Sequence, residues 1–328
     1  MKMKQVLFTV VSMMLLFSCG NEKPKVTEDK EEVVKAKAPE FNADSAFYFI
    51  EKQVSFGPRV PETAAHNSCI LWLEQKFKEY SVDVFIQEGP KTNQTKYRIR
   101  NLIVSFNKEA KDRILLCAHW DSRAMADQDK ERKAEPILGA DDGASGVGVL
   151  LEVARVLSSQ PLKSTGVDII LFDVEDQGIS GPAYEKDSWC VGAQYWSKNP
   201  HIPNYRARFG VLLDMVGAKA AHFPKEGVSL KHASYYVDKI WSTAWEIGYS
   251  DYFENKEERQ IIDDHLYVNE IRQIPTVDII YISDESPTGF GSHWHTHQDN
   301  LDIIGKNTLK AVGQTLIQVL YQEDLENQ

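Results

Sequence analysis

Five short runs of almost unbroken apolar residues constrain the fold of this chain more than any other feature. The runs cover residues 101–106, 113–120, 167–176, 209–217 and 276–283. Strands of this composition are buried on both faces of a sheet, because half-exposed strands alternate apolar and polar residues instead. Apolar residues also recur at helical spacing in three segments, residues 68–80, 145–158 and 235–247. The alternation predicts an α/β fold, a three-layer sandwich around a mostly parallel, mixed central sheet.

The first residues of the chain predict export. Lys2 and Lys4 precede an apolar run of the length of a signal-peptide core, which is too short to cross a bilayer as a helix. Residues 16–19 read LFSC and resemble the lipobox of bacterial lipoproteins. We therefore expect a lipoprotein signal peptide at residues 1–18 and a lipid on Cys19, in the periplasm or at the outer membrane of a bacterial cell envelope. An ordinary signal peptide with an incidental cysteine is the alternative.

Composition then separates a tether from a folded domain. Residues 19–40 are rich in Lys and Glu and have almost no large apolar side chains. Such a segment cannot bury enough surface to offset the entropy of ordering, so it predicts a flexible tether. The remaining residues, 41–328, are expected to form a single domain.

Charge and cysteine content narrow the expected partners and cross-links. The net charge of −11 argues against nucleic acid, because phosphate binding needs clustered Lys and Arg. With Cys19 lipidated, Cys69, Cys117 and Cys190 are left, and this odd number predicts no disulfide framework. We expect a monomer that touches the membrane only through its lipid.

Polar side chains occur where three of the apolar runs end. His119 lies near the end of the second run and Asp121 follows it, Glu175 and Asp176 end the third, and Asp214 lies near the end of the fourth. In parallel α/β sheets, sites lie just beyond the carboxyl ends of the strands. Acids buried there must be paired, hydrogen-bonded or bound to metal, since their desolvation is otherwise costly. Imidazole and carboxylate groups together are typical of catalytic zinc sites, which use three protein ligands.

The order of motifs along the chain resembles the family of zinc aminopeptidases that includes the glutaminyl cyclases. The motifs are H-x-D at 119–121, G-A-D-D-G-A-S-G at 139–146, the acidic pair at 175–176, an isolated aspartate at 214 and a late histidine at 295. The resemblance covers roughly residues 101–304, which is most of the domain. The resemblance implies an aminopeptidase-like fold and one Zn²⁺ ion per chain, bound by Asp142, Asp176 and His295.

The same resemblance implies roles for the other acids. Glu175 would be the general base and acid. Asp214 and Asp263 would lie beside it in a network that shares protons, because three close carboxylates cannot all ionise without strong repulsion. Asp121 would orient His119 from outside the set of metal ligands.

Four details resemble the cyclases of this family more than its peptidases. They are W-H-T at 294–296, D-D-H at 263–265, a phenylalanine at 290 and D-S-x-x-x-G at 187–192. The resemblance implies a glutaminyl-peptide cyclotransferase, an acyltransferase that converts the N-terminal glutamine of peptides and proteins to pyroglutamate and releases ammonia. Trp294 and Phe290 would then wall a small apolar pocket for the glutamine side chain.

Three departures from the cyclase pattern bear on the site. Asp176 stands where the cyclases usually have Glu, so the coordination geometry must adjust. Residues 177–186 form a longer segment than in animal cyclases, and Trp189 is then the candidate for a pocket tryptophan, with a packed core residue as the alternative. Ile262 replaces a glutamine that precedes D-D-H in animal cyclases, so a substrate hydrogen bond is expected from another residue.

Alternatives exist for both the activity and the metal ligands. A two-zinc aminopeptidase would hold a second metal at His119, Asp142 and Asp214. A binding module of this fold would have lost its metal and its catalysis. His293 and His297 are alternative ligands, because residues two apart on an extended segment point to the same side.

Overall fold

The computed structural model describes residues 35–81, 83–91, 96–219 and 221–328. Ala36–Gln328 forms one compact unit. The predicted signal peptide, the lipid on Cys19 and residues 19–34 of the predicted tether lie outside the described residues. None of the described helices is long and apolar enough to span a bilayer.

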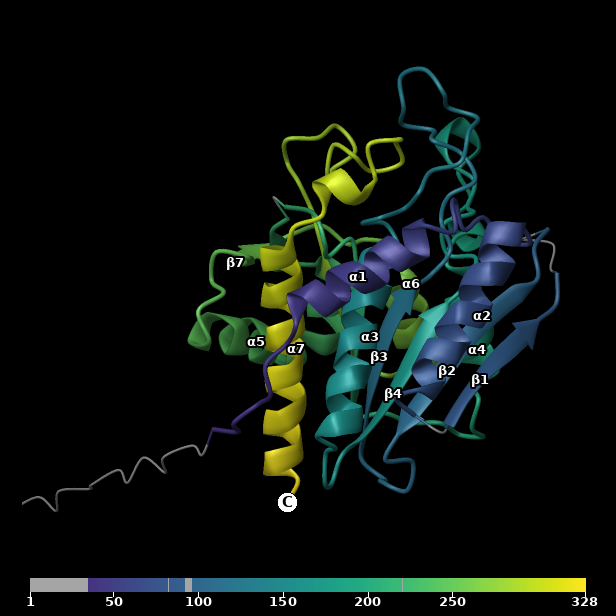
Figure 1. Cartoon of the computed structure of the whole chain (residues 1–328). Helices are drawn as coiled ribbons and strands as arrows, with labels where there is room; N and C mark the ends of the chain where they lie inside the picture. The colour runs from purple at the N-terminus through teal and green to yellow at the C-terminus, as the bar shows by residue number, and fades with distance from the viewer. Residues whose placement is uncertain (1–34, 82, 92–95, 220) are drawn as a thin grey trace, which may run out of the picture. The chain divides into compact units, whose positions relative to one another are not determined.

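A central sheet of six strands runs through the described part of the chain (Figure 1). In spatial order the strands are β1 (Asp83–Gly89), β2 (Ile99–Phe106), β4 (Gly166–Phe172), β3 (Arg113–His119), β5 (Phe209–Asp214) and β8 (Thr276–Ile280). β4, β3, β5 and β8 are parallel, whereas β2 pairs antiparallel with β4 and β1 pairs antiparallel with β2. The predicted mostly parallel, mixed sheet is confirmed, and each of the five apolar runs contains a strand.

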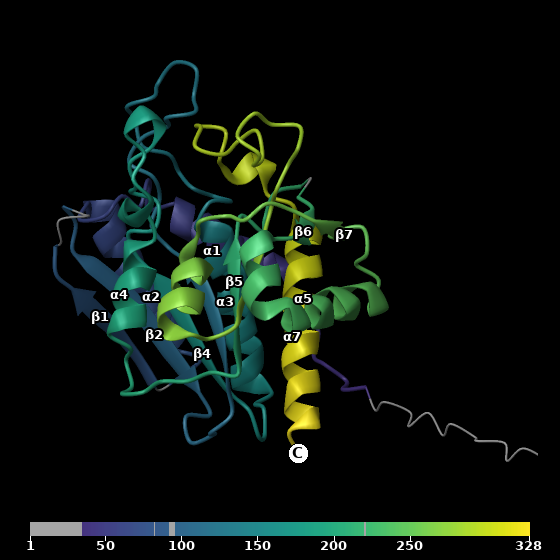
Figure 2. The same ribbon diagram turned by 180° about the vertical axis from the view of Figure 1, so that it is seen from behind.

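Helices cover both faces of this sheet and complete the three layers. One face carries α1 (Ala43–Val54), α2 (Ala64–Lys78), α3 (Ala144–Ser159) and α7 (Lys306–Glu326), and the other carries α4 (Val191–Lys198) and α6 (Asp264–Tyr267), as Figures 1 and 2 show. α5 (Gly227–Glu246) packs against β8 and α7. Leu116 of β3 belongs to the apolar cluster of the first face, and its neighbours Leu115 and Cys117 belong to the cluster around α4. The three predicted helices correspond to α2, α3 and α5.

The other elements are short and lie mostly in the connections. They are β6 (Phe223–Lys225) and β7 (Phe253–Glu257), which form a small parallel pair, the 3₁₀ turns η1 (Gly181–Ala183), η2 (Lys186–Ser188) and η4 (Leu301–Ile303), and the π turn η3 (Val268–Arg272). Cys69, Cys117 and Cys190 are buried and free, which agrees with the expected lack of disulfides for the described residues.

The residues ahead of α1 lie along α7. The backbone nitrogen of Ala36 donates to Gln322 Oε1 at 2.8 Å, and that of Phe41 donates to Gln314 Oε1 at 2.9 Å. The ring of Phe41 is buried against Gly313, where an added Cβ would lie 2.2 Å from a ring carbon. Packing therefore starts at the end of the segment assigned to the tether, and the domain start at residue 41 stays a prediction.

Candidate active site

A pocket of about 320 Å³ opens beyond the carboxyl ends of the parallel strands. The residues predicted for the one-zinc site, for proton transfer and for substrate binding all line it, namely Asp142, Glu175, Asp176, Trp189, Asp214, Ile262, Asp263, Phe290, Trp294 and His295. The alternative ligands His119, His293 and His297 are not among the lining residues. The lining residues come from segments that are far apart in the sequence. Parallel strands end at the same edge of the sheet, and this geometry brings the segments together.

Two glycines bring the first turn of α3 against the strand ends. Gly143 has a φ of +94°, and a Cβ there would lie 2.6 Å from the carbonyl oxygen of Asp121. A Cβ on Gly146 would lie 2.3 Å from the carbonyl oxygen of Leu213. Glycine alone permits such an approach, and this explains why the G-A-D-D-G-A-S-G segment can hold Asp142 beside β3 and β5.

Asp142, Asp176 and His295 form a compact group of possible metal ligands, the first donor group of the site. One ligand atom from each lies within 4.8 Å of the others, and His295 Nε2 lies 3.0 Å from Asp176 Oδ1 and 3.7 Å from Asp142 Oδ2. Asp142 Oδ2 and Asp176 Oδ2 are buried without a hydrogen-bond donor. Although burial lowers it, the charge of Asp176 raises the pKa of His295 to about 9, so this position favours a cation. Two carboxylates and one imidazole fit a catalytic zinc ion.

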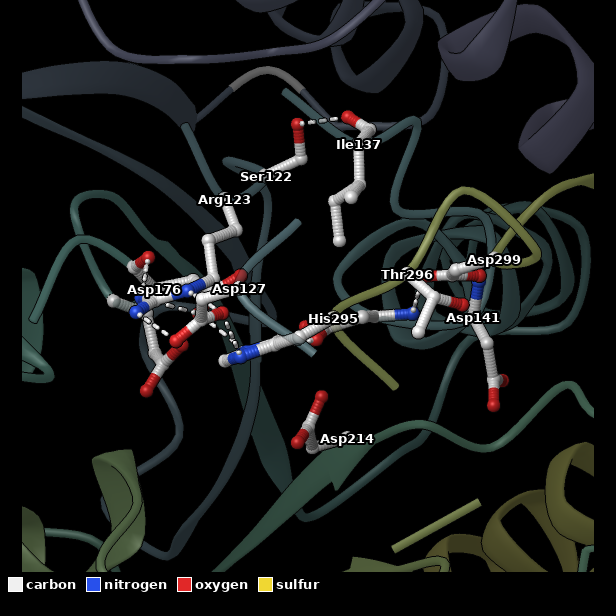
Figure 3. A network of polar contacts seen from close by, with 12 residues as sticks. Ser122, Arg123, Asp127, Ile137, Asp141, Asp176, Asp214, His295, Thr296 and Asp299 are labelled. Carbon is white, nitrogen blue, oxygen red and sulfur yellow. Dashed lines mark hydrogen bonds and ion pairs between the residues drawn. The ribbon is translucent and has the colours of Figure 1, made fainter. Parts of the chain in front are cut away.

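The other nitrogen of the His295 ring has its own carboxylate partner. Nδ1 lies 3.0 Å from Asp127 Oδ1, and Arg123 holds both oxygens of Asp127 at 2.9 and 3.0 Å (Figure 3). The effect of burial, which raises the pKa of Asp127, is outweighed by the close contact with His295 and the hydrogen bonds from Arg123, so this pKa stays well below its ordinary value. Neither Asp127 nor Arg123 belongs to a motif that the sequence makes recognisable.

The neighbouring histidines of the H-W-H-T-H segment bind other acids. His293 Nε2 lies 2.8 Å from Asp141 Oδ2, and His297 Nδ1 lies 2.6 Å from Asp129 Oδ2. His295 alone of the three lines the pocket. Its backbone has a φ of 54°, in the left-handed region, so the segment is not the extended strand that would turn all three rings to one side.

Burial raises the pKa values of the acids beside this donor group. It raises the pKa of Asp214 to about 8, and it raises the pKa of Glu175 well above the ordinary value, with further contributions from the charges of Asp176 and Asp263. The pKa of Asp263 is raised for the same reason. Glu175 Oε1 also accepts a hydrogen bond from Cys190 Sγ at 3.2 Å. The shared-proton network stays a prediction, and these raised pKa values agree with it.

His119 forms a second donor group with two of the same acids. Its Nε2 lies 3.0 Å from Asp142 Oδ1 and 3.2 Å from Asp214 Oδ1. One ligand atom from each of the three residues lies within 4.8 Å of the other two. The Nδ1 atom lies 3.6 Å from Asp121 Oδ1, close to the expected partner. Asp121 also accepts the backbone amides of Glu175 and Asp176, at 3.1 and 3.4 Å, and the sequence did not reveal this second role.

Aromatic rings form one wall of the same pocket. The ring centroids of Phe290 and Trp294 are 4.8 Å apart. The Trp294 ring stacks on His295 at 3.6 Å, and the Trp189 ring lies parallel to His295 at 6.1 Å. Trp189 is half-buried and faces the pocket.

The pocket also contains residues that the sequence analysis did not single out. They are Tyr184, Met215, Arg259, Gln260, Ile261, Ile280 and Thr288. Gln260 carries the type of side chain that the replacement at Ile262 removes, and it lies two positions earlier in the chain. The sequence could therefore have indicated Gln260, because this glutamine lies close to the D-D-H motif, two positions before Ile262.

Comparisons with known proteins give one consistent family. The model of Peptidase family M28 matches residues 101–320. A Zn-dependent exopeptidase from Parabacteroides distasonis is 49% identical, with a TM-score of 0.84, over 87% of this chain and 99% of that chain. A glutaminyl cyclase from Tannerella forsythia is 46% identical, with a TM-score of 0.84, over 86% and 99%. A glutaminyl-peptide cyclotransferase from Gloydius blomhoffii is 26% identical over 262 residues, 70% of this chain and 68% of the relative.

Proposed function

The chain belongs to peptidase family M28, and we propose that it is a zinc-dependent glutaminyl-peptide cyclotransferase. It would convert the N-terminal glutamine of peptides and proteins to pyroglutamate and release ammonia. The observation that carries this proposal is a buried glutamate, Glu175, in one pocket with an acidic donor group and a wall of aromatic rings. The likeness to the bacterial glutaminyl cyclases supports the same activity.

We propose one zinc ion per chain, bound by Asp142, Asp176 and His295. When bound, zinc supplies a Lewis acid that stabilises negative charge on the side-chain carbonyl oxygen of the substrate. The second donor group does not require a second metal. A proton on His119 Nε2 would lie within hydrogen-bond distance of both Asp142 and Asp214 and would satisfy both carboxylates.

Glu175 would move the proton in this reaction. It takes a proton from the α-amine as the amine attacks the side-chain amide carbon, and it returns a proton to the departing amide nitrogen. A raised pKa makes the carboxylate a stronger base for the first step, and its acid form then carries the proton that the second step needs. Asp214 and Asp263 would keep a proton nearby and limit the repulsion between the acids.

The aromatic wall would select the cyclising conformation. Trp294, Phe290, Trp189 and Ile262 would fold the glutamine side chain back toward its own amine, and such positioning can contribute several kcal/mol. An apolar wall also excludes water, which favours cyclisation over hydrolysis. Gln260 is the candidate for the substrate hydrogen bond that Ile262 cannot make.

The test of this function compares two products. The purified protein is incubated with peptides that begin with glutamine and with aminoacyl anilides, and released ammonia and released aromatic amine are measured. We expect ammonia from the first and no amine from the second. Release of amine without ammonia would favour an aminopeptidase. That activity is the second candidate because His119, Asp142 and Asp214 could hold a second metal and because the chain is similar to an exopeptidase.

Metal content separates the remaining alternatives. One tightly bound zinc per chain agrees with the proposal, and two would favour the aminopeptidase. If the purified protein bound no zinc, a non-catalytic binding module would be favoured. The complete set of ligands, Asp142, Asp176 and His295, argues against that alternative.

We also propose that the mature protein is a monomer, tethered to a bacterial envelope membrane by a lipid on Cys19. The sequence of residues 16–19 supports the lipid anchor. Replacing Cys19 by alanine should move the protein from the membrane fraction to the soluble fraction. Sedimentation of the lipid-free protein should give the mass of one chain, and a dimer mass would contradict the monomer.

A further inference from the structure

We propose that Arg123 is a positioning residue that joins the metal-binding half of the pocket to its aromatic wall, so that one side chain sets the affinity for zinc and for the glutaminyl substrate. The substrate part of this inference rests on the proposed function. Arg123 follows β3 in the chain, is 2% exposed and contacts both halves of the site.

The first contact of Arg123 is with the carboxylate behind the metal-ligand histidine. Its Nε and Nη2 atoms donate to the two oxygens of Asp127 at 2.9 and 3.0 Å, which is the two-pronged geometry that a guanidinium forms with a carboxylate. Asp127 in turn lies 3.0 Å from His295 Nδ1. A carboxylate in this position fixes the tautomer and the direction of a ligand histidine. Arg123 thus holds the group that aims His295 (Figure 3).

The second contact of Arg123 is with another proposed metal ligand. Its Nη1 donates to the backbone oxygen of Asp176 at 2.9 Å and lies 3.5 Å from Asp176 Oδ1. A buried cation at this point offsets the repulsion among the acids of the donor group. Loss of Arg123 would therefore disturb Asp176 and His295 together.

The third set of contacts reaches the loop that leads to Trp189, one ring of the aromatic wall. Nη2 donates to Ser180 Oγ at 3.2 Å and to the carbonyl oxygen of Gly178 at 3.4 Å, and Ser180 Oγ donates to Asp127 Oδ2 at 2.6 Å. Residues 181–187 of this loop are all exposed, so few apolar contacts hold it in place. These polar contacts anchor the loop.

The same guanidinium lies under the indole of Trp189. Its central carbon is 4.6 Å from the ring centroid, and the indole nitrogen donates to Ile179 of the same loop at 3.3 Å. A Cβ on Gly178 would lie 2.1 Å from Trp189, so the loop closes tightly over this ring. An arginine stacked in this way cannot be replaced by lysine without loss of the stack and the fork.

Zinc affinity tests the metal half of the proposal. We would measure it by competition with a chromophoric chelator for the wild type, Arg123→Met, Arg123→Lys and Arg132→Met. Arg132 is a matched control, because it is an exposed arginine that pairs with Glu135. Arg123→Met should weaken zinc binding roughly 10- to 100-fold, the usual cost of losing an outer partner of a metal site. Arg123→Lys should lose less affinity, and Arg132→Met should lose none. Wild-type affinity in Arg123→Met would overturn the proposal.

KM for a glutaminyl peptide, measured at saturating zinc, tests the pocket half. Arg123→Met and Arg123→Lys should both raise KM severalfold, because both lose the support under Trp189. Trp189→Leu should raise KM with zinc affinity unchanged, and combining it with Arg123→Met should raise KM by less than the product of the two single effects. If the double variant raised KM by the full product of the two single effects, Arg123 and Trp189 would act independently and the proposed coupling would be wrong.

The two proposals fail in different ways. If the wild type releases no ammonia from glutaminyl peptides, the proposed function fails, while the zinc affinities still decide whether Arg123 supports the metal site. If Arg123→Met does not fold, Arg123→Lys and Ser180→Ala replace it. Ser180→Ala removes one anchor of the loop and should raise KM, and unchanged KM in both variants would overturn the role in the pocket.

Discussion

Asp121 lies beneath the turn that carries Glu175, and its Oδ1 accepts a hydrogen bond from the Glu175 backbone nitrogen at 3.1 Å. Its Oδ2 accepts one from the side-chain amide of Gln177 at 3.0 Å. A single buried carboxylate thus holds the turn that presents the proposed base. Asp121 thus contacts the backbone of the turn at Glu175 as well as the ring of His119.

We therefore expect Asp121→Asn to lower both stability and activity. The substituted amide can turn its NH₂ group against backbone donors, and an unsatisfied buried group costs about 1–3 kcal/mol. Thermal unfolding and ammonia release would be measured beside Asp302→Asn, a control at an exposed aspartate. A variant with wild-type stability and wild-type kcat would show that the turn does not depend on Asp121.

Glu175→Gln should lower kcat by roughly 100- to 10,000-fold, the usual contribution of a general acid or base. The amide keeps the shape of the side chain but cannot accept the proton of the α-amine. Zinc content should stay at the wild-type level, because Glu175 is outside the proposed ligand set. Exposed Glu131→Gln is the control. Substantial activity in Glu175→Gln would assign the proton transfer to another acid.

Removing the metal should lower the melting temperature. A ligand that binds only the folded state stabilises it by about 2.7 kcal/mol at one hundred times its Kd. The effect should be absent in His295→Ala and present in His297→Ala, since His297 pairs with Asp129 outside the pocket. Calorimetry with and without added zinc would measure it. Full zinc retention by His295→Ala would contradict the ligand assignment.

A chain that begins at Phe41 should be less stable than one that begins at Lys35. It loses the bonds that Ala36 makes with Gln322 and Gln318, at 2.8 and 2.9 Å, and each such bond contributes about 0.5–1.5 kcal/mol. Urea unfolding of the two chains would measure the difference. Equal free energies of unfolding would support the predicted tether boundary at residue 40.

The sequence predicted the central sheet well and its margins poorly. Strands buried on both faces show as unbroken apolar runs, and all five such runs became strands. β1 lies at the edge and is half-exposed along most of its length, so it has no such run. α7 does repeat Leu309, Val312 and Leu316 at helical spacing, and the same periodicity argument would have found it.

The sequence by itself determined which side chains could meet at the active site. Motifs that end parallel strands must converge, because those strands finish at one edge of the sheet, and Asp142, Asp176 and His295 do meet there. Only the tertiary structure decided which acid meets which histidine, since Asp127, Asp129 and Asp141 are equally plausible partners in the sequence. The pairing depends on how the loops fold over the sheet, and no periodic pattern of residues encodes that path. The proposed role of Arg123 depends on its contacts with Asp127 and with residues 178–180, which only the folded loops bring together.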